Sequence, residues 1–113
     1  MRPLLATAAL VLSAGVLSAG VALAESSYTL TIKDHRFDPA EMTVPAGEKF
    51  QLKVVNQDRT PEEFESKDLH REKVVPGGGQ ITLTIGPLKP GRYEYFGEFN
   101  PTTARGFIVA QPK

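Results

Sequence analysis

The sequence predicts an all-β protein, a Greek-key sandwich or barrel of about seven short strands. Apolar and polar residues alternate in residues 28–32, 50–54 and 81–85, as expected of strands that are half buried. Turn-forming proline and glycine separate these segments, most clearly at residues 45–47 and 76–79. Short alternating runs with turns between them favour strands over helices in this part of the chain.

The expected strands can be placed in order along the chain. Residues 66–70 are compatible with either one helical turn or a loop. Further turn signals at Pro87 and Gly91 follow the strand at 81–85. The clearest alternating patterns cover residues 28–32, 50–54 and 81–85. Residues 107–109 are expected to form a closing strand, and residues 71–73 to lie on the face of a strand.

Residues 1–24 have the pattern of a secretory signal peptide. Arg2 provides a positive charge, residues 4–21 are an uncharged apolar run, and residues 22–24 read Ala-Leu-Ala, a typical cleavage site. An uncleaved membrane anchor is the alternative, because the run approaches spanning length. We expect cleavage, which leaves residues 25–113 as one domain in the periplasm and limits membrane contact to the segment that is removed.

Composition restricts what this domain can do. Residues 25–113 hold every acidic residue and every basic residue except Arg2, so their charge is close to neutral and offers no footprint for nucleic acid. With 0 Cys, the fold depends on packing and not on disulfides. No supported Ser-His-Asp arrangement, phosphate-binding glycine loop or His-x-x-His pair occurs, so we expect a protein that is not an enzyme.

Four segments together resemble the cupredoxins. They are Thr-Val-Pro-Ala-Gly at 43–47, Val-Val-Asn-Gln-Asp at 54–58, Pro-Gly-Arg-Tyr-Glu-Tyr at 90–95, and Gly106 before the last strand. The resemblance covers about residues 28–110 and implies a β-sandwich. It places the family's copper ligands at Glu62, Gly97 and Asn100, with the axial methionine expected between residues 102 and 105. A blue-copper centre needs a thiolate, two imidazoles and a weak axial ligand, so no such centre is expected here.

A narrower resemblance concerns iron uptake. The segments Glu-Phe-Glu-Ser at 63–66 and Phe-Gly-Glu-Phe at 96–99 look like those of EfeO-type periplasmic cupredoxin-like domains and their small relatives, which accompany ferrous-iron permeases. Two cysteines of the EfeO-type domain correspond to Phe37 and Gly97 here, so only the acidic part of that site is shared. The resemblance implies handling of iron or copper beside permease components or another periplasmic metal-binding protein.

The candidate metal ligands are mainly glutamates. If Phe64 points into the core, strand alternation puts Glu63 and Glu65 together on the opposite face, roughly 7 Å apart along the strand, and puts Glu62 on the side of Phe64. Glu98 belongs to the second loop and is expected at the same end of the sandwich. Converging carboxylates with an imidazole would suit iron, manganese, calcium or Cu(II).

Two histidines are candidate imidazole ligands. His35 is the first choice, because the start of this type of sandwich often approaches the ligand end, and His70 is the second, because basic residues surround it. The alternative interpretation is that the glutamates are a solvated acidic edge that blocks aggregation. A second functional hypothesis is therefore a metal-free scaffold that binds a protein partner. Ferrous oxidation by this domain alone is disfavoured, because electron transfer needs a redox centre with tuned ligands and the domain offers no soft ligand beyond Met42.

Overall fold

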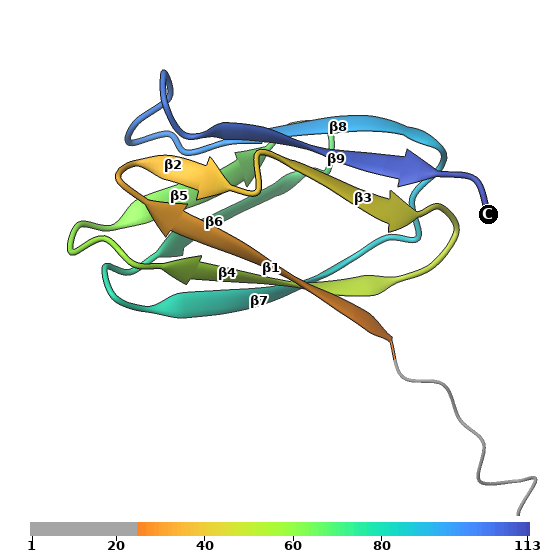
Figure 1. The fold of residues 1–113 in the computed structure, drawn as a ribbon, viewed down its shortest axis with the longest axis horizontal. Coiled ribbons are helices and arrows are strands. Elements are labelled where there is room, and N and C mark those ends of the chain that lie inside the picture. Colours follow the sequence, from red (N-terminus) through yellow and green to blue (C-terminus); the bar gives the residue numbers. More distant parts are fainter. Residues whose placement is uncertain (1–24) are drawn as a thin grey trace, which may run out of the picture.

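A computed structural model describes residues 25–113, which form two β-sheets packed face to face (Figure 1). The four-stranded sheet has the order β2-β1-β4-β7 and consists of β1 (Ser26–Lys33), β2 (Arg36–Asp38), β4 (Phe50–Asn56) and β7 (Gln80–Ile85). The five-stranded sheet has the order β3-β9-β8-β5-β6 and consists of β3 (Glu41–Pro45), β9 (Arg105–Gln111), β8 (Gly91–Phe96), β5 (Glu62–Ser66) and β6 (Arg71–Val75).

The connections give this sandwich its Greek-key character. The chain changes sheet after β2, β3, β4, β6 and β7, so most neighbouring strands are not consecutive in sequence. Strand β1 runs parallel to β4, and β3 runs parallel to β9, whereas the other strand pairs are antiparallel. The predicted all-β Greek-key sandwich is confirmed.

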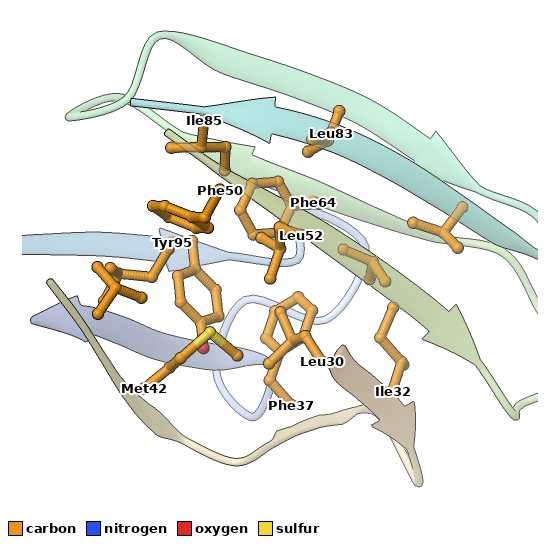
Figure 2. Packing of buried hydrophobic residues seen from close by; sticks show 14 of the residues in the cluster. Leu30, Ile32, Phe37, Met42, Phe50, Leu52, Phe64, Leu83, Ile85 and Tyr95 are labelled. Carbon is orange, nitrogen blue, oxygen red and sulfur yellow. The ribbon is translucent and has the colours of Figure 1, made fainter. Parts of the chain in front are cut away.

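An aromatic group lies at the centre of the core between the two sheets (Figure 2). The ring of Phe64 is 5.2 Å from that of Tyr95 and 6.3 Å from that of Phe37, centroid to centroid. Leu30 and Leu52 from the facing sheet are fully buried beside them. Burying each such apolar side chain contributes about 1.5–3 kcal/mol, so this group anchors β5 firmly against the opposite sheet.

The strands that the sequence predicts coincide with strands of the structure. The predicted strands at 28–32, 50–54, 71–73, 81–85 and 107–109 lie within β1, β4, β6, β7 and β9. Residues 66–70 contain no helix: β5 ends at Ser66, and a turn over residues 67–70 leads into β6, closed by the His70 N–H donating to the Lys67 carbonyl. The signal peptide predicted at 1–24 lies outside the described residues. Within residues 25–113 there is no helix able to cross a membrane.

Four loops meet at one end of the sandwich, the left end in Figure 1. The β4–β5 loop contacts the β1–β2 turn through Asp58, which accepts hydrogen bonds from the N–H groups of Asp34 and His35. It contacts the β6–β7 loop through the Gly78 N–H, which donates to the Asp58 carbonyl. Glu62, the first residue of β5, binds the β8–β9 loop. This end of the fold therefore brings the predicted ligand loops together.

Candidate functional site

Four glutamates gather where the outer face of β5 meets the β8–β9 loop. Because Phe64 points into the core, its neighbours Glu63 and Glu65 lie on the other face of β5, as predicted. Glu72 of β6 is the register partner of Glu65, and Glu98 comes from the β8–β9 loop. One carboxylate oxygen from each of the four lies within 4.8 Å of the others. We call Glu63, Glu65, Glu72 and Glu98 the acidic cluster.

Glu63 is the buried member of this cluster. Glu63 is only 7% exposed, and its Oε1 atom has no hydrogen-bond donor within the described part of the chain. Burial raises the pKa of Glu63 to about 8, and close contact with the carboxyl groups of Glu98 and Glu65, together with the charge of Glu72, acts in the same direction. A carboxyl group in this position therefore holds a proton near neutral pH or requires a cation.

The other members of the cluster have no cationic partner either. None of the ion pairs formed within residues 25–113 includes Glu63, Glu65, Glu72 or Glu98. Arg71, next to Glu72 in sequence, instead donates to the Thr84 carbonyl of β7. Like charges directly opposite in a sheet, such as Glu65 and Glu72, are destabilising, so the cluster is electrostatically incomplete by itself. Its donor atoms are all carboxylate oxygens, which suit a hard cation.

Glu62 is placed differently from its neighbour. It points inward and is 1% exposed, and its two oxygens accept three hydrogen bonds. Oε1 accepts from the backbone N–H groups of Glu63, at 2.8 Å, and of Phe99, at 3.0 Å. Oε2 accepts from the side-chain amide of Asn100 at 2.6 Å. This predicted ligand is not a member of the acidic cluster, because its oxygens face hydrogen-bond donors inside the sandwich.

The same arrangement shows why a blue-copper centre does not fit. The three places that the sequence resemblance assigns to copper ligands, Glu62, Gly97 and Asn100, are indeed in contact. However, a Cβ atom on Gly97 would lie 2.5 Å from Glu62 Cδ and 2.9 Å from Ala104 Cβ. The Glu62 carboxylate therefore fills the space that a cysteine side chain would need. The residue at the family's first copper-ligand position is therefore a carboxylate that accepts hydrogen bonds from the protein.

The two histidines lie apart from the acidic cluster. His35 is in the β1–β2 turn, with a φ of 58°, and its Nδ1 is 3.6 Å from Asp58 Oδ2. The His35 N–H lowers the pKa of Asp58, and the Asp34 N–H acts in the same direction against the opposing effect of burial. His70 is exposed in the β5–β6 turn. The group of atoms that could hold a cation within the described residues includes neither imidazole.

Glu72 is the residue of the cluster that sequence analysis missed. The signal was present, because a short turn after Ser66 makes β5 and β6 a hairpin in which Ser66 pairs with Arg71. That register places Glu72 opposite Glu65 and on the same face. Because the sequence of residues 66–70 is compatible with both a helical turn and a loop, it does not fix this register.

Comparison with known proteins agrees with this architecture. Residues 4–110 match the family described as the cupredoxin-like domain. The chain belongs to this family. A relative from Rickettsia prowazekii (strain Madrid E), named Uncharacterized protein RP394, is 52% identical over 80 residues, which are 71% of this chain and 64% of the relative. The matched cupredoxin-like region thus spans less than two thirds of that relative's length.

Solved structures of the same fold include copper proteins. Auracyanin A, a "blue" copper protein of Chloroflexus aurantiacus, superposes with a TM-score of 0.67 at 13% identity, covering 78% of this chain and 100% of that one. Amicyanin of Paracoccus versutus superposes with a TM-score of 0.60 at 20% identity, covering 83% and 88%. At such identities the likeness shows the fold alone. Copper binding by those proteins does not carry over to a chain whose ligand positions hold Glu62, Gly97 and Asn100.

Proposed function

We propose that this cupredoxin-like domain is an exported binding protein for iron or copper that serves a ferrous-iron uptake system in the periplasm. The cation is held by the acidic cluster, with Glu63 as the central ligand. The domain binds and delivers the ion without catalysing a reaction. Its partners are permease components or another periplasmic metal-binding protein.

The observation that carries this proposal is the state of Glu63. A buried carboxylate oxygen without a donor is costly, because burial removes water and nothing replaces it. Three more carboxylates each place an oxygen within 4.8 Å of a Glu63 oxygen, which increases that cost. A cation bound between them satisfies the orphaned oxygen and relieves the repulsion together. An ordinary solvated acidic edge would not require a nine-tenths buried member.

The donor set favours iron over copper as the cargo. Carboxylate oxygens suit hard cations, whereas copper in proteins prefers imidazole or thiolate ligands, and the cluster contains neither. The sequence resemblance to EfeO-type domains in residues 63–66 and 96–99 supports the same choice and supplies the link with ferrous-iron permeases. The apolar run and Ala-Leu-Ala sequence at 1–24 support export.

Metal loading of the exported protein tests the proposal. Wild type, Glu63→Ala and Glu98→Ala are dialysed against Fe²⁺ without oxygen, or against Cu²⁺, and bound metal is measured per chain. Glu41→Gln is the matched control, because Glu41 is an exposed carboxylate of the same sheet that lies 3.7 Å from Arg92 and outside the cluster. Even outer-shell partners of a metal typically contribute roughly tenfold or more to its affinity, so loss of a ligand should cost at least as much.

The expected result is stoichiometric binding by wild type and by the control, and strongly weakened binding by both cluster variants. Thermal unfolding gives a second measurement, since a ligand at a hundredfold excess over its Kd stabilises the native state by about 2.7 kcal/mol. Equal, near-zero loading of all four proteins would reject the proposal.

A second candidate function is supported by two exposed apolar side chains. Phe99 is 51% exposed on the β8–β9 loop, immediately after Glu98, and Val74 is 48% exposed on β6, opposite Glu63 in register. As a metal-free scaffold, the domain would use this face to bind a protein partner. That function predicts the same melting temperature with and without Fe²⁺ or Cu²⁺, which separates it from the first proposal.

A further inference from the structure

We infer that Glu62 is a positioning residue for the proposed cation site: it fixes the β8–β9 loop so that Glu98 meets Glu63 and Glu65. The inference rests on the proposed function, because it assigns Glu62 a role in a site of which it is not a ligand. Glu62 occupies the position of the family's first copper ligand, but in this role its carboxylate accepts hydrogen bonds from the protein and does not bind the cation.

The geometry places Glu62 and Glu63 back to back on β5. Consecutive strand residues point to opposite faces, so Glu62 faces the interior while Glu63 faces the acidic cluster. Glu62 Oε1 also accepts the N–H of Glu63 itself. The inner carboxylate is therefore bonded directly to the backbone of the central ligand on one side and to the β8–β9 loop on the other.

On the loop side, the contacts of Glu62 fall immediately beside Glu98. The Phe99 N–H, which donates to Glu62 Oε1, belongs to the peptide group that begins at the Glu98 carbonyl carbon. The Asn100 side chain donates to Oε2 at 2.6 Å. These hydrogen bonds fix the backbone on the C-terminal side of Glu98 relative to β5. They therefore restrict where the Glu98 carboxylate can lie in the acidic cluster.

The loop itself is built to transmit this restraint. Asn100 is its centre: the Asn100 carbonyl accepts the N–H groups of Thr103, at 3.2 Å, and Ala104, at 2.8 Å, and the Asn100 N–H donates to the Gly97 carbonyl. Gly97 in turn donates its N–H to the Ala104 carbonyl at 2.9 Å. The loop is therefore a compact unit. Two of the three hydrogen bonds of Glu62 connect this loop to β5, and the third comes from the N–H of Glu63 on β5 itself.

Gly97 makes the arrangement possible. A side chain there would occupy the position of the Glu62 carboxylate, since a Cβ atom would lie 2.7 Å from Oε1. The absence of a side chain at residue 97 and the presence of a carboxylate at residue 62 thus form one structural unit. At the family's copper-ligand positions, hydrogen bonds of Glu62 thus connect β5 to the β8–β9 loop where a bound metal would connect them.

The test compares two substitutions of Glu62 in the exported protein. Glu62→Ala removes every acceptor. Glu62→Gln keeps one oxygen for the two backbone N–H groups, and its amide can donate to the Asn100 side-chain oxygen once that side chain turns over. Leu83→Ala, a core truncation on β7 of the other sheet, controls for loss of stability alone. Affinities for Fe²⁺ without oxygen and for Mn²⁺ are measured for each variant.

We expect Glu62→Ala to weaken binding of both ions by roughly 10–100-fold, as for other residues that orient metal ligands, and Glu62→Gln to restore most of it. Leu83→Ala should bind as wild type does. A double-mutant cycle then tests the route: in a Glu98→Ala background, Glu62→Ala should have no further effect on affinity, because the ligand that it orients is already absent.

Amide hydrogen exchange gives a readout that needs no metal. In metal-free protein, exchange of the Phe99 N–H should accelerate in Glu62→Ala but not in Glu62→Gln. Wild type that binds the ions while Glu62→Ala binds equally well would overturn the positioning role and leave the proposed function standing. Equal effects of Glu62→Ala with and without Glu98 would also overturn it. Wild type that binds neither of these ions, nor Cu²⁺ in the loading experiment above, would overturn the proposed function and the positioning role with it.

Discussion

Glu62 and Glu63 are neighbours on one strand, and both are almost completely buried, yet their surroundings are opposite. Glu62 faces inward, and its oxygens accept three hydrogen bonds from uncharged N–H donors. Glu63 faces outward among three carboxylates, and one of its oxygens has no donor within residues 25–113. The first carboxylate is complete within the fold, whereas the second is incomplete.

The difference shows that burial by itself does not mark a functional carboxylate. What distinguishes the two residues is the type of neighbour, because a buried acceptor surrounded by donors is an ordinary part of a stable protein. A buried acceptor surrounded by other acceptors needs a proton or a cation. The following changes alter the surroundings of either Glu62 or Glu63, beginning with the one expected to affect stability most.

Glu62→Ala should lower the free energy of unfolding of the metal-free protein most, by about 3 kcal/mol or more. The change leaves three donors without their acceptor: the buried N–H of Glu63, and the partly buried Phe99 N–H and Asn100 amide. An unsatisfied buried group costs about 1–3 kcal/mol, and a partly buried one costs less. Urea unfolding followed by circular dichroism measures the loss. A change below about 0.5 kcal/mol, typical of a surface substitution, would show that the hydrogen bonds of Glu62 do not stabilise the fold.

Gly97→Ala should cost about 1–3 kcal/mol, because the new methyl group meets the Glu62 carboxylate and Ala104 Cβ in a packed interior. The cost should become smaller in a Glu62→Ala background, where the obstructing carboxylate is gone. The same unfolding experiment on both pairs of proteins provides the measurement. Equal costs in the two backgrounds would contradict the view that residues 62 and 97 share one space.

The stability of the metal-free protein should fall as pH rises from about 4.5 to about 8. The pKa of Glu63 is raised from 4.5 to about 8 in the folded state, so between these values the folded protein holds a proton that the unfolded chain has released. Glu63→Gln should remove this dependence and should therefore be more stable than wild type at pH 8. Melting temperatures between pH 5 and pH 8 test this, and parallel curves for the two proteins would exclude it.

Glu72→Lys should have the smallest effect on stability and opposite effects on folding and binding. Replacing the like charge opposite Glu65 by an opposite charge should stabilise the metal-free protein by about 0.2–1 kcal/mol. The same lysine should weaken cation binding. Glu41→Lys, on β3 and outside the cluster, makes the same change in net charge and is the control. Stabilisation without any loss of metal affinity would remove Glu72 from the site.

Much of the fold was predictable from the sequence because local patterns were unambiguous. Alternation in residues 50–54 and 81–85 placed two strands, and Phe64 between two glutamates predicted which face of β5 is buried. The hairpin between β5 and β6 was not predicted, because the turn at residues 67–70 carries neither glycine nor proline to mark it. That gap is why Glu72 was missed.

The candidate site was predicted only in part, for a different reason. Glu63, Glu65 and Glu98 were correctly expected to lie together, whereas Glu62 and His35, which were also expected as ligands, bond to partners in other loops. Strand alternation separates the two faces of β5, but it does not say which loop will supply donors to the inner face. Those contacts depend on how the β8–β9 and β1–β2 segments approach β5.

By itself, the sequence determined the strand pattern, the absence of a blue-copper ligand set and the sidedness of Glu63 and Glu65, because these follow from residue identity and the period of a strand. Only the tertiary structure decided that the carboxylate of Glu62 is satisfied and that of Glu63 is not. The physical reason is that hydrogen-bond satisfaction of a buried group is a property of its neighbours in space, and residues 97–100 become neighbours of residue 62 only when the two loops meet.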